Sequence, residues 1–179
     1  MVKFIINSTF YTFVLLLSIF FLVHYQPETE AETGTHINAQ NPIEAGRYLV
    51  TIGGCNDCHT AGYLQKEGNI PEEDWLTGSR MGFRGPWGTT YASNLRLVVN
   101  NYDEDVWVEM IKTRKSMPPM PWMNVNKMSE KDARAIYKYL KSLGPKGVEM
   151  PVALSPDREP ETPYINFLPQ NLEAAQKNN

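Results

Sequence analysis

The sequence is poor in cysteine and histidine, with two cysteines and three histidines among 179 residues. A structural zinc site needs four such ligands at close spacing, but His24 and His36 lie far upstream of Cys55 and Cys58. No βαβ pattern, which a thioredoxin-like dithiol would need, surrounds the two cysteines. A disulfide between them would close only a tiny loop. Zinc, dithiol and disulfide chemistry therefore explain this pair poorly.

The sequence also lacks an excess or a cluster of positive charge. It has 17 basic and 20 acidic residues, a formal net charge of -3, and its Lys and Arg residues are dispersed. Binding of nucleic acid usually involves a basic block or patch. We therefore expect no nucleic-acid partner.

The two cysteines occur in the pentapeptide Cys55-Asn56-Asp57-Cys58-His59. A C-x-x-C pair followed directly by histidine is the attachment motif of a c-type haem. The two thiols can reach the vinyl groups of one porphyrin edge and become thioethers, and the histidine can then ligate the iron from the same side. The motif predicts one covalent haem c bound to Cys55 and Cys58, with His59 as an axial ligand.

Residues 4–23 carry no charge and follow a single lysine, Lys3. Twenty helical residues span about 30 Å, which is the thickness of a bilayer's hydrocarbon core. A cleaved signal peptide is the alternative, but no A-x-A cleavage site follows Val23. We expect residues 1–23 to form a transmembrane helix that anchors the chain in a bacterial inner membrane, with the remainder in the periplasm.

The composition divides the rest of the chain into three parts. Residues 24–40 are polar and acidic, which predicts a flexible tether. Residues 41–144 have the length and patterning of one folded domain, and residues 145–179 form a tail rich in proline that we expect to lie on the domain surface. Glycines and prolines recur through residues 60–101, with aromatic residues among them, which predicts loops held by buried aromatic side chains.

Three helices are predicted within the folded domain. Capping residues and helical spacing indicate one helix from Asn41-Pro42 into the haem motif, one over about 103–114 and one over about 130–143. The apolar stripes predicted for their buried faces are, in order, Tyr48, Leu49 and Ile52; Val106, Trp107, Met110 and Ile111; and Ala133, Ile136, Tyr137 and Leu140.

A methionine-rich segment supplies candidates for the second axial ligand. Residues 116–123 read SMPPMPWM, and prolines stiffen such a segment into an extended strap. A methionine thioether paired with histidine raises the reduction potential of a haem. Composition alone leaves several candidates open, namely Met117, Met120, Met123, Met128 and, in a glycine-rich loop, Met81.

With these motifs the sequence resembles the cytochrome c family, in its single-haem, α-helical form. The resemblance covers about residues 43–144 and rests on GRYLV-x-x-GG-CNDCHT and on MPW-x-x-x-x-KMSEKDARAIYKYLKSL. It implies an all-α fold, with three main helices around the covalent haem, for a cytochrome c domain at residues 41–144. In this family the ligand methionine occurs in an M-P-aromatic step, eight residues before a second methionine. This pattern implies Met120 as the axial ligand, with Met117 as the runner-up.

The resemblance also implies a crossed contact of the first and last helices, involving Gly46 and Tyr48 on one side and Ile136 and Tyr139 on the other. The Gly85-Pro86-Trp87-Gly88 loop, with Tyr91 and Asn94, and the TPYINF segment of the tail are similar to cytochrome subunits that serve bacterial dehydrogenases.

The function that follows is electron transfer rather than catalysis. His59 and Met120 would fill both axial positions of the iron, with a dehydrogenase as the electron donor and an oxidase or another cytochrome as the acceptor. The alternative is a haem enzyme or gas sensor with an open or displaceable sixth position. Whether the chain is a free carrier or a subunit of a stable complex stays open.

Overall fold

The computed structural model describes residues 39–171. Within this part of the chain no helix is long and apolar enough to cross a membrane. The predicted anchor at residues 1–23 and nearly all of the predicted tether lie outside the described residues.

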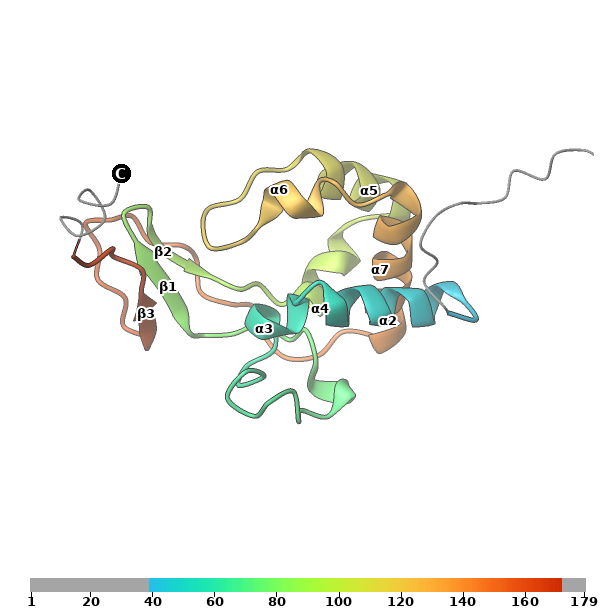
Figure 1. The fold of residues 1–179 in the computed structure, drawn as a ribbon, viewed down its shortest axis with the longest axis horizontal. Coiled ribbons are helices and arrows are strands. Elements are labelled where there is room, and N and C mark those ends of the chain that lie inside the picture. The colour runs from blue at the N-terminus through green and yellow to red at the C-terminus, as the bar shows by residue number, and fades with distance from the viewer. Residues whose placement is uncertain (1–38, 172–179) are drawn as a thin grey trace, which may run out of the picture. The chain divides into compact units, whose positions relative to one another are not determined.

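The three predicted helices form close to their expected bounds. They are α2 (Pro42–Ile52), α5 (Glu104–Thr113) and α7 (Glu130–Leu143). Their N-caps are Asn41, Asp103 and Ser129, whose side chains each accept a hydrogen bond from a backbone N–H in the first turn. Shorter helical segments are α3 (Cys55–His59), η1 (Glu72–Asp74), α4 (Leu95–Val98), η2 (Val99–Asn101) and α6 (Trp122–Val125) (Figure 1).

The first helix and the haem motif are separate helices. Gly53 is the C-cap of α2, and Gly54 has a φ angle of 65°, in the left-handed region that glycine adopts without strain. The chain turns there and α3 starts at Cys55.

Helices α2 and α7 pack against each other at Gly46. A Cβ atom on Gly46 would overlap the carbonyl oxygen of Ala135 and would lie 2.7 Å from the Cβ of Tyr139. The predicted crossing with a small residue at its centre is therefore confirmed for Gly46 and Tyr139. The prediction for Tyr48 is wrong, because its side chain is 47% exposed.

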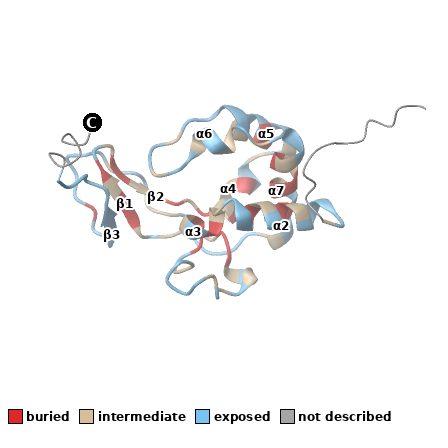
Figure 2. Cartoon of the chain, in the orientation of Figure 1, coloured by how far each residue is buried: buried red, intermediate tan, exposed pale blue. Residues whose placement is uncertain are grey.

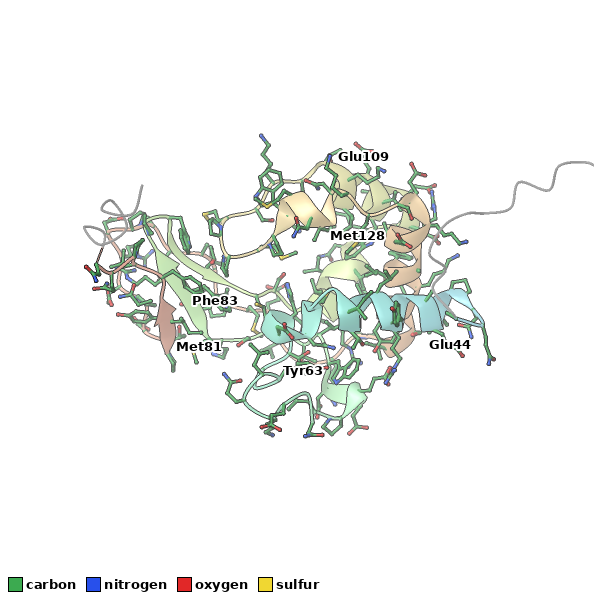
Figure 3. The ribbon with its side chains drawn as sticks, in the orientation of Figure 1. Glu44, Tyr63, Met81, Phe83, Glu109 and Met128 are labelled. Carbon is green, nitrogen blue, oxygen red and sulfur yellow. The ribbon has the colours of Figure 1, made fainter. Side chains whose placement is uncertain are left out.

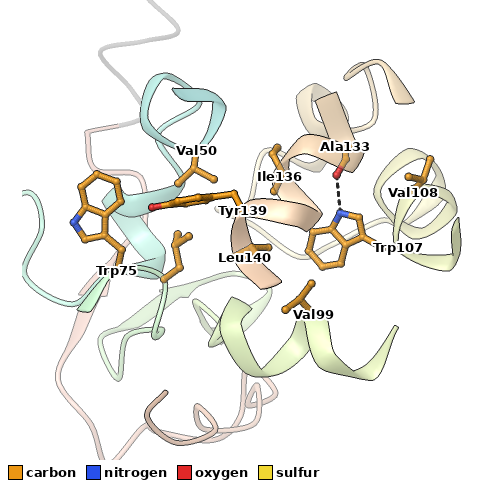
Figure 4. Close-up of a cluster of buried hydrophobic side chains, with 10 residues drawn as sticks. Val50, Trp75, Val99, Trp107, Val108, Ala133, Ile136, Tyr139 and Leu140 are labelled. Atoms are coloured by element: carbon orange, nitrogen blue, oxygen red, sulfur yellow. Dashed lines mark hydrogen bonds between the residues drawn. The ribbon is translucent and has the colours of Figure 1, made fainter. Parts of the chain in front are cut away.

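The core lies between α2, α5 and α7. Tyr139 extends from α7 beneath Val50 toward Trp75, and the indole nitrogen of Trp107 donates to the carbonyl of Ala133 at 3.1 Å (Figure 4). Buried residues are frequent on α7, whereas α6 and β3 are exposed or half-buried (Figure 2).

Two predicted stripes are partly wrong. Ile52 and Val106 are exposed, while Val50 and Val108 are buried. On α2 the reason is the contact at Gly46, because residues three and four positions along share one helix face. Leu49 and Val50 therefore face α7, and Ile52 does not. On α7 Tyr137 is half-buried, and Ala133, Ile136 and Leu140 are buried as predicted.

A small sheet corrects the all-α prediction. Strands β1 (Gly82–Gly85) and β2 (Gly88–Tyr91) form an antiparallel hairpin, and β3 (Tyr164–Asn166) pairs in parallel with β1, giving the order β2-β1-β3. The three strands lie together at one end of the described domain, with α2, α5 and α7 at the other (Figure 1). Strands of three or four residues are too short to show a readable alternation of polar and apolar residues. The tail lies on the surface, as predicted, but one part of it is a strand.

Candidate haem site

A cavity of about 470 Å³ opens between α3, the hairpin and the methionine strap. This volume is within the range of cofactor and ligand sites. Its apolar walls come from several elements: Phe83, Ala92, Leu95, Val98, Trp107, Ile111, Val125 and Ile136. Cys55, Cys58 and His59 line the cavity, so the structure brings the three residues of the predicted attachment motif to one site.

His59 is buried and held in one orientation. Its side chain is 7% exposed, and Nδ1 lies 2.7 Å from the carbonyl oxygen of Ser93. Because a carbonyl only accepts, Nδ1 carries the proton and Nε2 keeps its lone pair. Burial lowers the pKa of His59, which favours the neutral imidazole that ligates metals. A histidine that ligates a metal usually donates its other ring N–H to a carbonyl or carboxylate, as His59 does here.

Two residues at the start of α4, the N-cap Asn94 and Arg96, fix the loop that presents Ser93. Asn94 caps α4 and its amide donates to the carbonyls of Lys146 and Val148, at 2.8 and 3.1 Å. Arg96 is 4% exposed, and its guanidinium donates to the backbone carbonyls of Leu143 and Gly144 at the end of α7 and of Glu73 in η1. The orientation of His59 is thus tied to the packing of α7.

Two buried polar side chains, Asn56 and Thr60, connect the haem motif to the backbone at Leu76 by hydrogen bonds. The Thr60 hydroxyl donates to the side-chain oxygen of Asn56 at 2.7 Å and accepts from the backbone N–H of Leu76 at 2.8 Å. Asn56 and Thr60 are 1% and 2% exposed. No pattern in the sequence indicates Ser93, because its contribution is a backbone carbonyl, and none indicates the pairing of Asn56 with Thr60.

The two thiols do not have the environment of a redox or metal-binding pair. Burial raises the pKa of Cys55 to about 11, and burial also raises the pKa of Cys58. Reactive and zinc-bound cysteines have lowered pKa values. Among residues 39–171, moreover, no group of three or more His, Cys, Asp or Glu side chains could hold a metal ion. Two neutral thiols at the cavity wall fit covalent attachment better.

The strap brings two methionines to the cavity. Met117 and Met120 both line it, at 46% and 37% exposure, whereas Met81, Met123 and Met128 are absent from its walls. Met128 lies beside α7 and packs against the core (Figure 3). Met110 on α5, which the sequence predicts as part of the buried face of its helix, also lines the cavity. Among the predicted candidates for the second axial ligand, the geometry keeps Met117 and Met120 without choosing between them.

One wall of the cavity is polar and positively charged, at Arg114, Lys115 and Ser116. The hydroxyl of Ser116 is buried, and no hydrogen-bond partner for it exists within the described part of the chain. Buried polar groups are almost always hydrogen-bonded, so this donor indicates a missing acceptor. A haem has an apolar ring and two carboxylates, and the lining fits both.

Comparisons with known proteins agree with this geometry. A family model described as Cytochrome c matches residues 43–144. The chain is 28% identical over 129 residues to the cytochrome c subunits of the quinone alcohol dehydrogenases of Gluconacetobacter polyoxogenes and Komagataeibacter europaeus. Each match covers 66% of this chain and 24% of the relative, so the chain spans only part of the length of these relatives. No solved structure matches.

Proposed function

The chain belongs to the cytochrome c family, and we propose that it is a single-haem electron carrier in which His59 and Met120 ligate the iron. Membership of this family implies a covalent haem c and a role in electron transfer. The similarity to dehydrogenase cytochrome subunits supports redox proteins as partners.

One observation carries the proposal: an imidazole and a thioether line the same cavity from different elements. His59 belongs to α3 on one side, and Met120 belongs to the strap before α6 on the other (Figure 1). Both candidate methionines line the cavity, and the preference for Met120 rests on its Met-Pro-aromatic step. Met117 is followed by two prolines instead.

The protein's own residues have distinct tasks in this proposal. Cys55 and Cys58 hold the porphyrin through thioether bonds, and Ser93 keeps the Nε2 lone pair of His59 available by accepting from Nδ1. When bound, the haem supplies a one-electron couple between ferric and ferrous iron. The apolar walls exclude water, which together with a soft thioether ligand favours the ferrous state.

Two filled axial positions leave no site at the iron for a substrate. The proposed role is therefore that of a carrier or of the cytochrome subunit of an oxidoreductase complex, and not of a catalyst. By analogy with the quinone alcohol dehydrogenase subunits, the donor is a dehydrogenase. An oxidase or another cytochrome accepts the electron. We place this exchange in the periplasm, with residues 1–23 as the anchor in the inner membrane.

Two measurements on the purified, haem-loaded chain test the proposal. Mass spectrometry after denaturation is expected to find one haem still attached, since thioether bonds survive unfolding. A variant with both Cys55→Ala and Cys58→Ala is the control and should release its haem.

After reduction, carbon monoxide is expected to bind slowly and weakly, because a methionine occupies the sixth position. Rapid, tight binding of carbon monoxide would contradict the carrier and support a haem enzyme or gas sensor with an open position.

A further inference from the structure

Hydrogen bonds hold the strap between α5 and α6 at two points: its base, where the chain leaves α5, and its tip, at Pro118. At the base, the amide of Asn126 donates to the carbonyls of Ile111 and Arg114, at 2.5 and 3.3 Å. At the tip, the hydroxyl of Thr90 on β2 donates to the carbonyl of Pro118 at 2.7 Å. Thr90 also lies 3.5 Å from the carbonyl of Phe83, but one hydroxyl has one proton, so the shorter contact holds it.

This contact bears directly on the sixth ligand. Pro118 lies between Met117 and Met120, the two methionines of the strap that line the cavity. A bond from β2 to this carbonyl limits how far the strap can swing away, whichever of the two thioethers binds. The prolines stiffen the strap, so a restraint at one point acts along its length.

Strand β2 is in turn held by the C-terminal tail. Thr89, next to Thr90, exchanges two backbone hydrogen bonds with Leu154, with N–H to oxygen contacts at 2.9 and 2.8 Å. Thr89 is fully buried. The tail also reaches the site itself, because Pro151 and Ala153 line the cavity.

Arg84 on β1 binds the tail to the hairpin through hydrogen bonds and an ion pair. Its guanidinium donates to the carbonyls of Arg158 and Pro156, at 2.8 and 3.3 Å, and to the hydroxyl of Thr89 at 3.2 Å. It also pairs with the Glu159 carboxylate at 2.9 Å. Its side chain is 19% exposed, so these contacts are partly shielded from water.

We propose that the tail from residue 145 to 168 and the β1–β2 hairpin form a clasp that keeps the sixth-ligand methionine on the iron, with Thr90 as its positioning residue. This inference rests on the proposed function, since it needs a methionine-ligated haem. It goes beyond the family, because the tail follows the matched residues 43–144.

Competition by imidazole for the ferric iron of the full, haem-loaded chain tests the clasp. Imidazole must displace the methionine, so its apparent affinity rises as the strap loosens. Thr90→Val removes the hydroxyl at nearly constant volume and is expected to tighten imidazole binding roughly 2- to 10-fold, the effect of one lost hydrogen bond. Thr90→Ser should restore the wild-type affinity. Arg84→Met should tighten imidazole binding in the same direction by releasing the tail.

The matched control is Thr77→Val, which removes a hydroxyl that donates to the carbonyl of Asp74 at 3.0 Å and lines no wall of the cavity. It is expected to leave imidazole binding unchanged. Equal affinities in Thr90→Val and Thr77→Val would overturn the clasp, and so would a Thr90→Ser variant that behaves like Thr90→Val. A wild-type ferric protein without the methionine-to-iron charge-transfer band would overturn methionine ligation itself, and the clasp with it.

Discussion

Tyr139 is a single residue whose hydroxyl joins the core to the surface. Its side chain is 2% exposed, and its hydroxyl donates to the carboxylate of Glu72 at 2.8 Å. Glu72 also accepts from Arg47 at 2.9 Å. Burial, aided by the bond to Glu72, raises the pKa of Tyr139, so folding favours the neutral phenol.

The sign of the resulting pH dependence follows from this shift. In the unfolded chain a tyrosine has a pKa of about 10. Because the folded pKa is higher, the contribution of Tyr139 to stability is full below about pH 10 and declines as the pH rises above it. Tyr139→Phe is therefore expected to lower the free energy of unfolding by about 1–2 kcal/mol at pH 7.

Denaturant unfolding at pH 7 and at several values above pH 10 measures this effect. The difference between wild type and Tyr139→Phe should shrink above pH 10, because only the wild type loses the contribution. Tyr48→Phe is the control, since Tyr48 is 47% exposed. A difference that stays constant across this range would contradict the assigned role of Tyr139.

Sequence reasoning found the residues whose chemistry requires them to be adjacent. Cys55, Cys58 and His59 were predicted as one unit because two thioethers and one ligand must reach the same porphyrin. Ser93 and Thr90 were not found, since each acts through a contact with a residue distant in sequence. The preference for Met120 over Met117 rests on the resemblance, because both methionines line the cavity.

At the scale of elements, the contact of α2 with α7 makes a prediction at Gly46. Replacement of glycine by alanine inside a helix normally stabilises it by about 1 kcal/mol. Here the added methyl group would overlap the Ala135 carbonyl and press on Tyr139. Gly46→Ala is expected to lower the free energy of unfolding by about 1–3 kcal/mol, because overpacking outweighs the gain in propensity.

Thermal or denaturant unfolding of the haem-loaded protein checks the sign of this change. Tyr48→Ala, on the same helix but exposed, should change stability by no more than about 0.5 kcal/mol. A Gly46→Ala variant as stable as the wild type would argue against the close approach of the two helices.

The helices were predictable because their signals are local. Asn41, Asp103 and Ser129 each cap a helix through a bond to a backbone group two or three residues away. The sheet was missed because its signal is not local. Strand β3 pairs Ile165 with Phe83, and no pattern within three or four residues of either strand indicates that partner.

At the scale of the whole molecule, the proposed anchor at residues 1–23 makes a prediction about the mass of the mature protein. The sequence predicts a retained anchor, since no A-x-A site follows the apolar stretch. Intact-mass measurement of protein extracted from membranes with detergent is expected to include these residues. A mass that starts near residue 24 would show that the segment is a cleaved signal peptide.

The tail, which lies outside the region matched by the family model, contributes to the cavity and to the packing of the hairpin. The tail beyond residue 144 lines part of the cavity with Pro151 and Ala153 and pairs with the hairpin through Leu154. The walls of the cavity therefore include residues beyond position 144.

The near-infrared absorption of the ferric protein tests the central claim, histidine–methionine ligation of the haem, most directly. The account predicts a weak methionine-to-iron charge-transfer band in the wild type. The band should persist in Met117→Ala and disappear in Met120→Ala, with a lower reduction potential in the second variant because the thioether is lost. A band that survives Met120→Ala and disappears in Met117→Ala would transfer the ligand to Met117. A wild-type protein without the band would contradict methionine ligation.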